Sequence, residues 1–408
     1  MFSYEESNWS RASRVMGKKY NTVLGSLLLA GAALAAPCPP AITAIAGQVA
    51  KLRDVPAPFS PPCRLIAPGA LRAALDRKLR RDLPVAPELF IEALAGLGFI
   101  EGEPGTVYSR LLDFYASQVL GYYEPDGDEM VVVNTPAAAR AEGDLVWAHE
   151  LEHAAQEHRF HLPSRLLAMR GDSDEQRAAS AIAEGEAMLV MFVLNTPGVA
   201  PEALALAETA VRQQARELAP PGVPRYFVAD LAFPYTAGFA TVLRAYRTGG
   251  WTAVDRLLAH PPASTAALLH PDRPGVPGTV PAGALPPVPE GWHEVFTDSV
   301  GEWGLAFLLG RRLGTPEADA LAAGWDGDRL RLVRDRARPD RWAVAWRLAC
   351  RTVQARQSLE EAMQRNLPAL FAHLAPPGQL EFTWVGAGRT LEVLAAWPPP
   401  SPRQRSPS

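Results

Sequence analysis

Residues 145–161 have the sequence LVWAHELEHAAQEHRFH, which combines a helix-compatible composition with a metal-binding motif. The motif is H-E-x-x-H, formed by His149, Glu150 and His153. On a helix, residues four positions apart share a face, so the two imidazoles can bind one ion. The carboxylate of Glu150 can then act as a general base on a water molecule beside that ion. The pattern predicts a zinc site on a helix that spans about residues 143–159.

The second half of the site is predicted on a helix at Glu175–Asn195, which is apolar nearly all round and therefore expected to be buried. It carries Glu184 and Glu186, and a buried carboxylate needs a cation or a hydrogen-bond donor. Residues two apart point to different sides of a helix, so only one is expected to bind the metal. Glu184 is favoured because Gly185 after it allows another backbone to approach. Glu186 is expected to pair with an arginine or to orient a ligand histidine.

His158 is an alternative third ligand that the spacing disfavours. A three-histidine site of the form H-E-x-x-H-x-x-G-x-x-H needs glycine at position 156 and histidine at position 159, where this chain has Gln156 and Arg159. His158 also lies off the face that the two motif histidines share. The chain has no C-x-x-C pattern, which argues against a thiolate zinc site. Four further histidines have no supporting motif around them: His161, His260, His293 and His373.

A β-hairpin is predicted directly upstream of the H-E-x-x-H helix. Ser117–Glu124 and Glu129–Asn134 have strand-like composition, and the turn residues Pro125-Asp-Gly-Asp separate them. An edge strand in this position can pair with an extended peptide by strand addition. The simpler interpretation is a hairpin that only packs on the helix, and the two interpretations are compatible.

The H-E-x-x-H motif and the Glu-Gly-x-Ala segment from Glu184 resemble the gluzincin metallopeptidases, the group that includes thermolysin and the aminopeptidase-N-like enzymes. More closely, the chain is similar to secreted bacterial proteins of the minigluzincin type. Their pattern has three blocks, which begin here at Gly121 (Gly-Tyr-Tyr-x-Pro), His149 (H-E-x-x-H-A-x-Q) and Glu184 (Glu-Gly-x-Ala). The resemblance implies that Glu150 activates the attacking water. It also implies that Zn²⁺ is bound by His149, His153 and Glu184.

A downstream segment, Phe233-Pro-Tyr-Thr-Ala-Gly238, is similar to the Tyr-x-x-Gly segment of aminopeptidase-N-like gluzincins. The resemblance implies that the hydroxyl of Tyr235 stabilises the oxyanion of the reaction, which a phenol can do by donating a hydrogen bond. The alternative is a core tyrosine at the start of a helix. A Ser-Thr-x-x-Leu-Leu-His-Pro segment of the resembling proteins also recurs here and contains His270. His270 is expected either to contact the substrate or to have a structural role.

The chain departs from the thermolysin pattern at Met188, where those enzymes carry an aspartate one turn after the third ligand. The spacer between His153 and Glu184 is also longer than theirs. The task of that aspartate, which is to orient a ligand histidine, must therefore fall to another residue or be absent.

The N-terminus has the organisation of a secretory signal peptide at residues 1–35. Basic residues precede an apolar run from Val23 to Ala36, which contains the cleavage-like triplet Ala33-Leu-Ala35. The translation start is either Met1 or Met16. Export to the cell envelope, the periplasm or the medium is expected, with no stable membrane span after cleavage, because the run is short for a bilayer. A retained signal anchor is the alternative.

Two of the three cysteines are expected to form a disulfide in an exported protein. Cys38 and Cys63 lie near the two ends of the proline-rich segment 36–67, which is predicted to be an extended lead-in. Cys350 would remain free and buried in an apolar run.

The predicted fold class is α+β, with two consecutive domains. Residues 68–275 are expected to form a mostly helical, zincin-like metallopeptidase domain with a short N-terminal sheet and the H-E-x-x-H helix. A Pro/Gly-rich linker at 276–290 leads to a smaller α+β domain at 291–397, and residues 398–408 form a disordered tail. Further helices are predicted near 71–81, 88–97, 107–115, 233–245, 295–309, 317–323 and 353–374. Further strands are predicted near 329–333, 341–350, 379–384 and 390–395, with a turn at 324–329.

A net charge of −4 gives no support for a surface that binds nucleic acid. The expected function is an exported zinc-dependent peptidase, and its expected partner is a peptide or protein substrate. The alternative is a zinc-binding but non-catalytic binding or envelope-assembly module on the same kind of scaffold.

Overall fold

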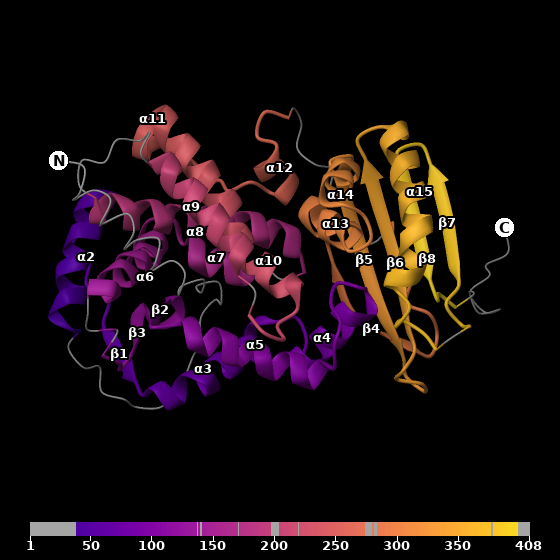
Figure 1. The fold of residues 1–408 in the computed structure, drawn as a ribbon, viewed down its shortest axis with the longest axis horizontal. Helices are drawn as coiled ribbons and strands as arrows, with labels where there is room; N and C mark the ends of the chain where they lie inside the picture. The colour runs from indigo at the N-terminus through magenta and orange to yellow at the C-terminus, as the bar shows by residue number, and fades with distance from the viewer. Residues whose placement is uncertain are drawn as a thin grey trace. The chain divides into compact units, whose positions relative to one another are not determined.

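A computed structural model describes residues 38–136, 138, 141–169, 171–196, 204–218, 220–273, 280, 284–376 and 378–398 (Figure 1). The fold is α+β, as the sequence predicts. The chain divides into two compact units. Unit 1 takes the residues up to 83 together with 107–168 and 177–262, and unit 2 takes 84–106, 169–176 and the residues from 263 onward. The units therefore interleave along the chain, which differs from the consecutive domains 68–275 and 291–397.

Unit 1 contains a three-stranded sheet in the order β1-β3-β2. β2 (Gly121–Glu124) and β3 (Glu129–Val133) are antiparallel and are joined by the short turn η1 (Pro125–Gly127), so the predicted hairpin is confirmed. β1 (Cys63–Ile66), which pairs in parallel with β3, has no counterpart among the predicted elements. The strand predicted from Ser117 is wrong at its start, because the preceding helix extends to Gln118.

Helices make up most of unit 1, and the H-E-x-x-H helix packs against β2 of this small sheet (Figure 1). The H-E-x-x-H helix α6 (Ala141–Phe160) and the helix α8 (Ser173–Asn195) both form as predicted. The expected connector between them contains a short helix, α7 (Leu162–Ala168). The other helical segments of unit 1 are α2 (Pro40–Arg53), α3 (Pro68–Asp82), most of α5 (Pro104–Gln118), α9 (Leu204–Glu217), α10 (Arg225–Phe233), the π-turn η2 (Pro234–Gly238) and α11 (Phe239–Ala259).

The extended lead-in predicted for residues 36–67 is wrong over α2. Proline at the first helical position, Pro40, lacks only an N–H that would have no intrahelical partner there. The segment also has apolar residues at helical spacing, which bury one face of α2 in the core of unit 1. These buried positions are Ile42, Ile45, Ala46 and Val49.

The predicted disulfide is confirmed. Cys38 and Cys63 are bonded, with their Cα atoms 4.9 Å apart, and the bond links the segment before α2 to β1. Cys350 is free and buried, as expected, and burial raises the pKa of its thiol to about 11.

Unit 2 is built on a five-stranded antiparallel sheet in the order β4-β5-β6-β8-β7. The strands are β4 (Trp292–Asp298), β5 (Trp325–Asp335), β6 (Trp342–Cys350), β7 (Phe382–Ala387) and β8 (Thr390–Ala395). The helix α15 (Val353–Leu370) lies against β6, β7 and β8, as Figure 1 shows in yellow. The remaining helices of unit 2 are α4 (Pro87–Gly96), α12 (Thr265–Leu269), α13 (Gly301–Gly310) and α14 (Thr315–Ala322).

Two predictions in unit 2 are wrong. The helix expected at 295–309 is a strand up to Asp298 and begins only at Gly301, whose φ of 76° breaks helical continuity. The turn expected at 324–329 lies largely within β5. There the buried carboxylate of Asp328 accepts hydrogen bonds from the indole N–H groups of Trp325 and Trp346 and from two backbone N–H groups. These bonds make it an anchor inside unit 2.

Among the residues that the structure describes, two stretches are long and apolar enough to cross a membrane by length and composition, namely α8 and residues 225–259. Most of each is buried inside the structure, which is typical of core helices in a soluble unit. The predicted signal peptide at 1–35 and nearly all of the tail at 398–408 lie outside the described residues, as does part of the linker at 276–290.

Candidate metal centre

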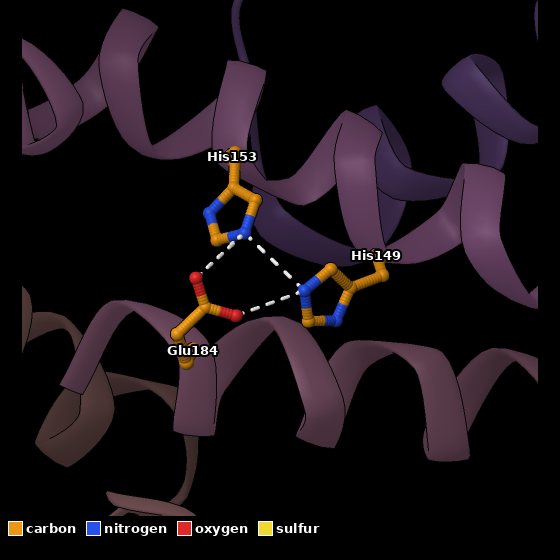
Figure 2. Close-up of side chains that lie close together, drawn as sticks. All are labelled: His149, His153 and Glu184. Carbon is orange, nitrogen blue, oxygen red and sulfur yellow. Dashed lines mark hydrogen bonds and ion pairs between the residues drawn. The ribbon is translucent and has the colours of Figure 1, made fainter. Parts of the chain in front are cut away.

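The side chains of His149, His153 and Glu184 converge between α6 and α8 (Figure 2). The two histidines are one turn apart on α6, so their rings lie on the face that meets α8. The Nε2 atom of His149 is 3.0 Å from Oε2 of Glu184, and Nε2 of His153 is 3.5 Å from Oε1 of the same carboxylate. The two Nε2 atoms are 3.3 Å apart. All three side chains are buried.

This arrangement fits a zinc ion in its geometry and in its donor chemistry. Two imidazole nitrogens and one carboxylate are a ligand set that zinc accepts in tetrahedral sites. Zinc–ligand bonds of about 2.0–2.1 Å at tetrahedral angles separate the donor atoms by roughly 3.3 Å, which is close to the three distances here. Among the residues that the structure describes, no other group of three histidine, cysteine or acidic side chains is placed to hold a metal.

The three groups are electrostatically coupled. Burial by itself would lower the pKa of His153, but the carboxylate of Glu184, together with Glu150 and Gln156, raises the pKa to about 9. Burial would likewise raise the pKa of Glu184, yet the two histidines lower it to about 2. The carboxylate therefore favours positive charge between the two imidazoles, which is the position that a bound cation would take.

Glu150, the predicted general base, lies on α6 beside the first ligand and is 2% exposed. Its Oε2 atom accepts a hydrogen bond of 3.3 Å from the backbone N–H of Tyr123 in β2. The carbonyl of Leu120 accepts a hydrogen bond from the backbone N–H of Val133 in β3. Along an antiparallel strand, the backbone groups of successive residues point alternately toward and away from the neighbouring strand. The N–H of Tyr123, three residues after Leu120, therefore points away from β3. The hairpin thus fixes the orientation of Glu150 through the side of β2 that does not face β3.

Tyr235 is buried in the π-turn η2, and its ring stacks against that of His149 with centroids 6.1 Å apart. Two glycines permit this approach. A Cβ atom on Gly185 of α8 would lie 2.4 Å from the carbonyl carbon of Gly238, and one on Gly238 would lie 1.9 Å from the oxygen of Ala181. The prediction that Gly185 lets another backbone segment approach closely is therefore confirmed. This close contact with Gly238 places Tyr235 beside the candidate metal centre.

Glu186 pairs with an arginine, as expected, and also reaches a ligand histidine through Gln156. Oε1 of Glu186 lies 2.5 Å from Nε of Arg53, and its Oε2 accepts from Nε2 of Gln156 at 2.7 Å. Oε1 of Gln156 is 3.0 Å from Nδ1 of His153. Neither Gln156 nor Arg53 is given a role by the sequence patterns. The glutamine of H-A-x-Q, one turn after a ligand, was the available signal.

Arg53 comes from α2 and is enclosed by acidic and aromatic side chains. Besides Glu186, its guanidinium contacts Glu152 at 3.4 Å and Asp255 at 2.6 Å, and it lies 4.2 Å from the ring centroid of Trp251. Burial acts to lower the pKa of Arg53, but Glu186 and Glu152 raise it above its ordinary value. Burial and the charge of Glu186 together raise the pKa of Glu152 well above its ordinary value.

The remaining candidate histidines have other partners. His158, which the spacing disfavours, pairs with Asp128 at 2.9 Å and is not part of the cluster. His270 ends α12 in unit 2, where its Nε2 lies 2.5 Å from Oε1 of Glu302. Arg273 contacts the other oxygen of Glu302. A structural role accounts for these contacts of His270, and its contact with substrate remains a prediction.

Comparison with known proteins gives one match, which lies outside the metal centre. A family model described as a domain of unknown function (DUF8575) matches residues 288–393, within unit 2. No curated protein and no solved structure matches the chain.

Proposed function

We propose that the chain is an exported zinc metallopeptidase of the gluzincin type, with unit 1 as a zincin-like catalytic domain. One observation carries the proposal. The predicted ligands His149, His153 and Glu184 converge at zinc-like spacings, although α8 contributes its carboxylate from 31 residues after His153 (184 − 153). The predicted general base, Glu150, lies next to the first ligand.

The metal would be held by His149, His153 and Glu184. When bound, zinc acts as a Lewis acid that polarises a carbonyl and makes an adjacent water acidic enough to lose a proton near neutral pH. The protein has to supply the groups that move the proton and bind the substrate.

Glu150 would take the proton from the attacking water and deliver it to the leaving amine. A base in this role must be held in one orientation, and the hydrogen bond from the N–H of Tyr123 does this. Because the carboxylate is 2% exposed, little bulk water competes for it.

Tyr235 would donate its hydroxyl proton in a hydrogen bond to the oxyanion that develops on the substrate carbonyl. Its support is positional, since its ring stacks on that of the ligand His149 and the Gly185–Gly238 contact fixes the π-turn that carries it. A donor fixed before the reaction stabilises the charge without reorganising.

The position of β2 at the edge of its sheet is consistent with an extended peptide as the substrate. In the sheet of the described residues β2 lies at one end of the order β1-β3-β2. On the side away from β3 the N–H of Tyr123 already donates to Glu150, so a peptide would pair with Gly121 and with the carbonyl of Tyr123. A peptide laid along that edge would pass next to Glu150, so strand addition and catalysis are compatible.

The decisive experiment is Glu150→Gln in the exported chain. It should retain zinc, measured by metal analysis of the purified protein, and lose hydrolysis of a panel of unfolded proteins and peptides. His149→Ala and Glu184→Ala are the controls that should lose zinc. Hydrolysis that survives in Glu150→Gln would reject the mechanism. A wild-type chain that holds zinc and cleaves nothing would favour the non-catalytic binding module instead.

A further inference from the structure

A continuous chain of hydrogen bonds runs from the ligand His153 into the interior of unit 1. It passes from Nδ1 of His153 to Gln156, from Gln156 to Glu186, and from Glu186 to Arg53 of α2. Gln156 and Glu186 are fully buried, and Arg53 is 2% exposed. Because water does not reach these groups, each must satisfy its hydrogen bonds within the protein.

The orientation of the Gln156 amide follows from its neighbours. One end of the amide is 2.8 Å from the backbone oxygen of Ala183 and 2.7 Å from Oε2 of Glu186. Both of these atoms accept hydrogen bonds and neither donates, so the amide nitrogen must face them. The amide oxygen is then the atom that faces His153.

The orientation of Gln156 in turn determines which nitrogen of His153 carries hydrogen. An amide oxygen only accepts, so Nδ1 of His153 must be the donor in their 3.0 Å contact. In the neutral imidazole this leaves the lone pair on Nε2, which faces His149 and Glu184. The hydrogen bond also fixes the rotation of the ring.

We propose that Gln156 is a positioning residue of the metal centre, which fixes the ring and the tautomer of His153, and that Glu186 and Arg53 fix the amide of Gln156 in turn. The proposal rests on the zinc site proposed above. In thermolysin-like enzymes an aspartate at the position of Met188 orients a ligand histidine. Under this proposal Gln156, which lies on the same helix as His153, performs that task here.

The test compares Gln156→Met with the wild-type chain. Methionine is similar in length, but its thioether sulfur is only a weak acceptor for the Nδ1–H bond. Zinc affinity should fall by about 10–100-fold, measured by competition with a chelator. The matched control is Tyr108→Phe, which removes a hydroxyl that donates to Asp76 at 2.7 Å elsewhere in unit 1. It should lower thermal stability without changing zinc affinity.

A second measurement begins with the wild type, and that part of it does not depend on how the variant folds. In wild-type protein with ¹⁵N-labelled histidine, two-bond proton–nitrogen correlation spectra should find a slowly exchanging proton on Nδ1 of His153, both with and without zinc. In Gln156→Met that proton should exchange faster.

The outcomes are distinct. Unchanged zinc affinity in Gln156→Met, or an Nδ1 of His153 without a proton in the wild type, would overturn the proposal. A wild-type chain that binds no zinc would reject the zinc site itself, while the Nδ1 signal would still decide the role of Gln156.

Discussion

Gly185 and Gly238 bring α8 and the π-turn η2 into backbone contact, so that a Cβ atom on Gly185 would lie 2.4 Å from the carbonyl carbon of Gly238. One glycine follows the carboxylate ligand Glu184, and the other ends the turn that carries Tyr235. The contact thus joins the proposed metal ligand to the proposed oxyanion donor. π-turns recur at functional sites because they displace one residue from the helical register.

Gly185→Ala should separate these two segments. A methyl group there has only backbone to displace, so a loss of about 1–3 kcal/mol in the free energy of unfolding is expected. Urea denaturation measures it. The matched control is Gly47→Ala in α2, where nothing lies within 4 Å of the added Cβ. Because alanine is the better helix former, that variant should gain about 0.5–1 kcal/mol. Equal effects of the two variants would contradict the close packing.

Tyr235→Phe should lower kcat by about 10²–10³-fold, because it removes one donor to the oxyanion. Zinc content should not change, since the phenylalanine ring can keep its stacking on His149. Steady-state kinetics on a cleaved peptide give the measurement. If kcat is retained, Tyr235 is a packing residue.

Loss of the Cys38–Cys63 bond should destabilise the chain. The bond closes a loop with a sequence separation of 25, for which chain entropy predicts a contribution of about 3 kcal/mol. Denaturation with and without reductant measures this contribution. The double variant Cys38→Ser/Cys63→Ser should be as unstable as the reduced wild type and should not respond to reductant. A response in that variant would assign the effect to another group.

Lys78 should make stability rise with pH in alkaline solution. Burial lowers its pKa from 10.5 to about 8, although Asp82 lies 3.2 Å away and opposes this shift. Between these two values the unfolded chain holds more protons than the folded chain, so raising the pH stabilises the fold. The gain between pH 7.5 and 10.5 is on the order of 3 kcal/mol, and it should be absent in Lys78→Met. Parallel urea titrations of both proteins at several pH values test the difference between them. If the free energy of unfolding depends on pH equally in the two proteins, the lowered pKa of Lys78 is contradicted.

The metal centre could largely be predicted from the sequence because its chemistry is local. The spacing of His149 and His153 places both side chains on one face of α6. Glu184 is indicated because its carboxylate lies in an apolar helix and directly precedes a glycine. Gln156 could not be assigned in the same way. Its partner Glu186 and the oxygen of Ala183 come from another helix, and the sequence gives no direct indication of which buried groups meet.

The errors in the predicted fold also have physical causes. Prolines suggested an extended segment at 36–67, yet Pro40 stands where a helix tolerates it, and the apolar spacing of α2 was the stronger signal. The segment from Val295 mixes apolar residues with Thr297, Asp298 and Ser299 without a clear period, so its pattern does not separate a strand from a helix. Gly301 marks the boundary between them, since its positive φ is evident only in the folded backbone.

Arg53 has implications for the order in which the chain assembles. Its partners Glu152, Glu186 and Asp255 follow it by 99, 133 and 202 residues. In a chain that emerges N-terminus first, Glu152 would therefore be the only one of these three acidic partners available to the guanidinium until α8 and α11 arrive. We expect the interior beneath the metal centre to close only once α11 is available. In limited-proteolysis experiments, fragments that end before Asp255 should accordingly lack the protection that α2 and α6 have in the complete chain.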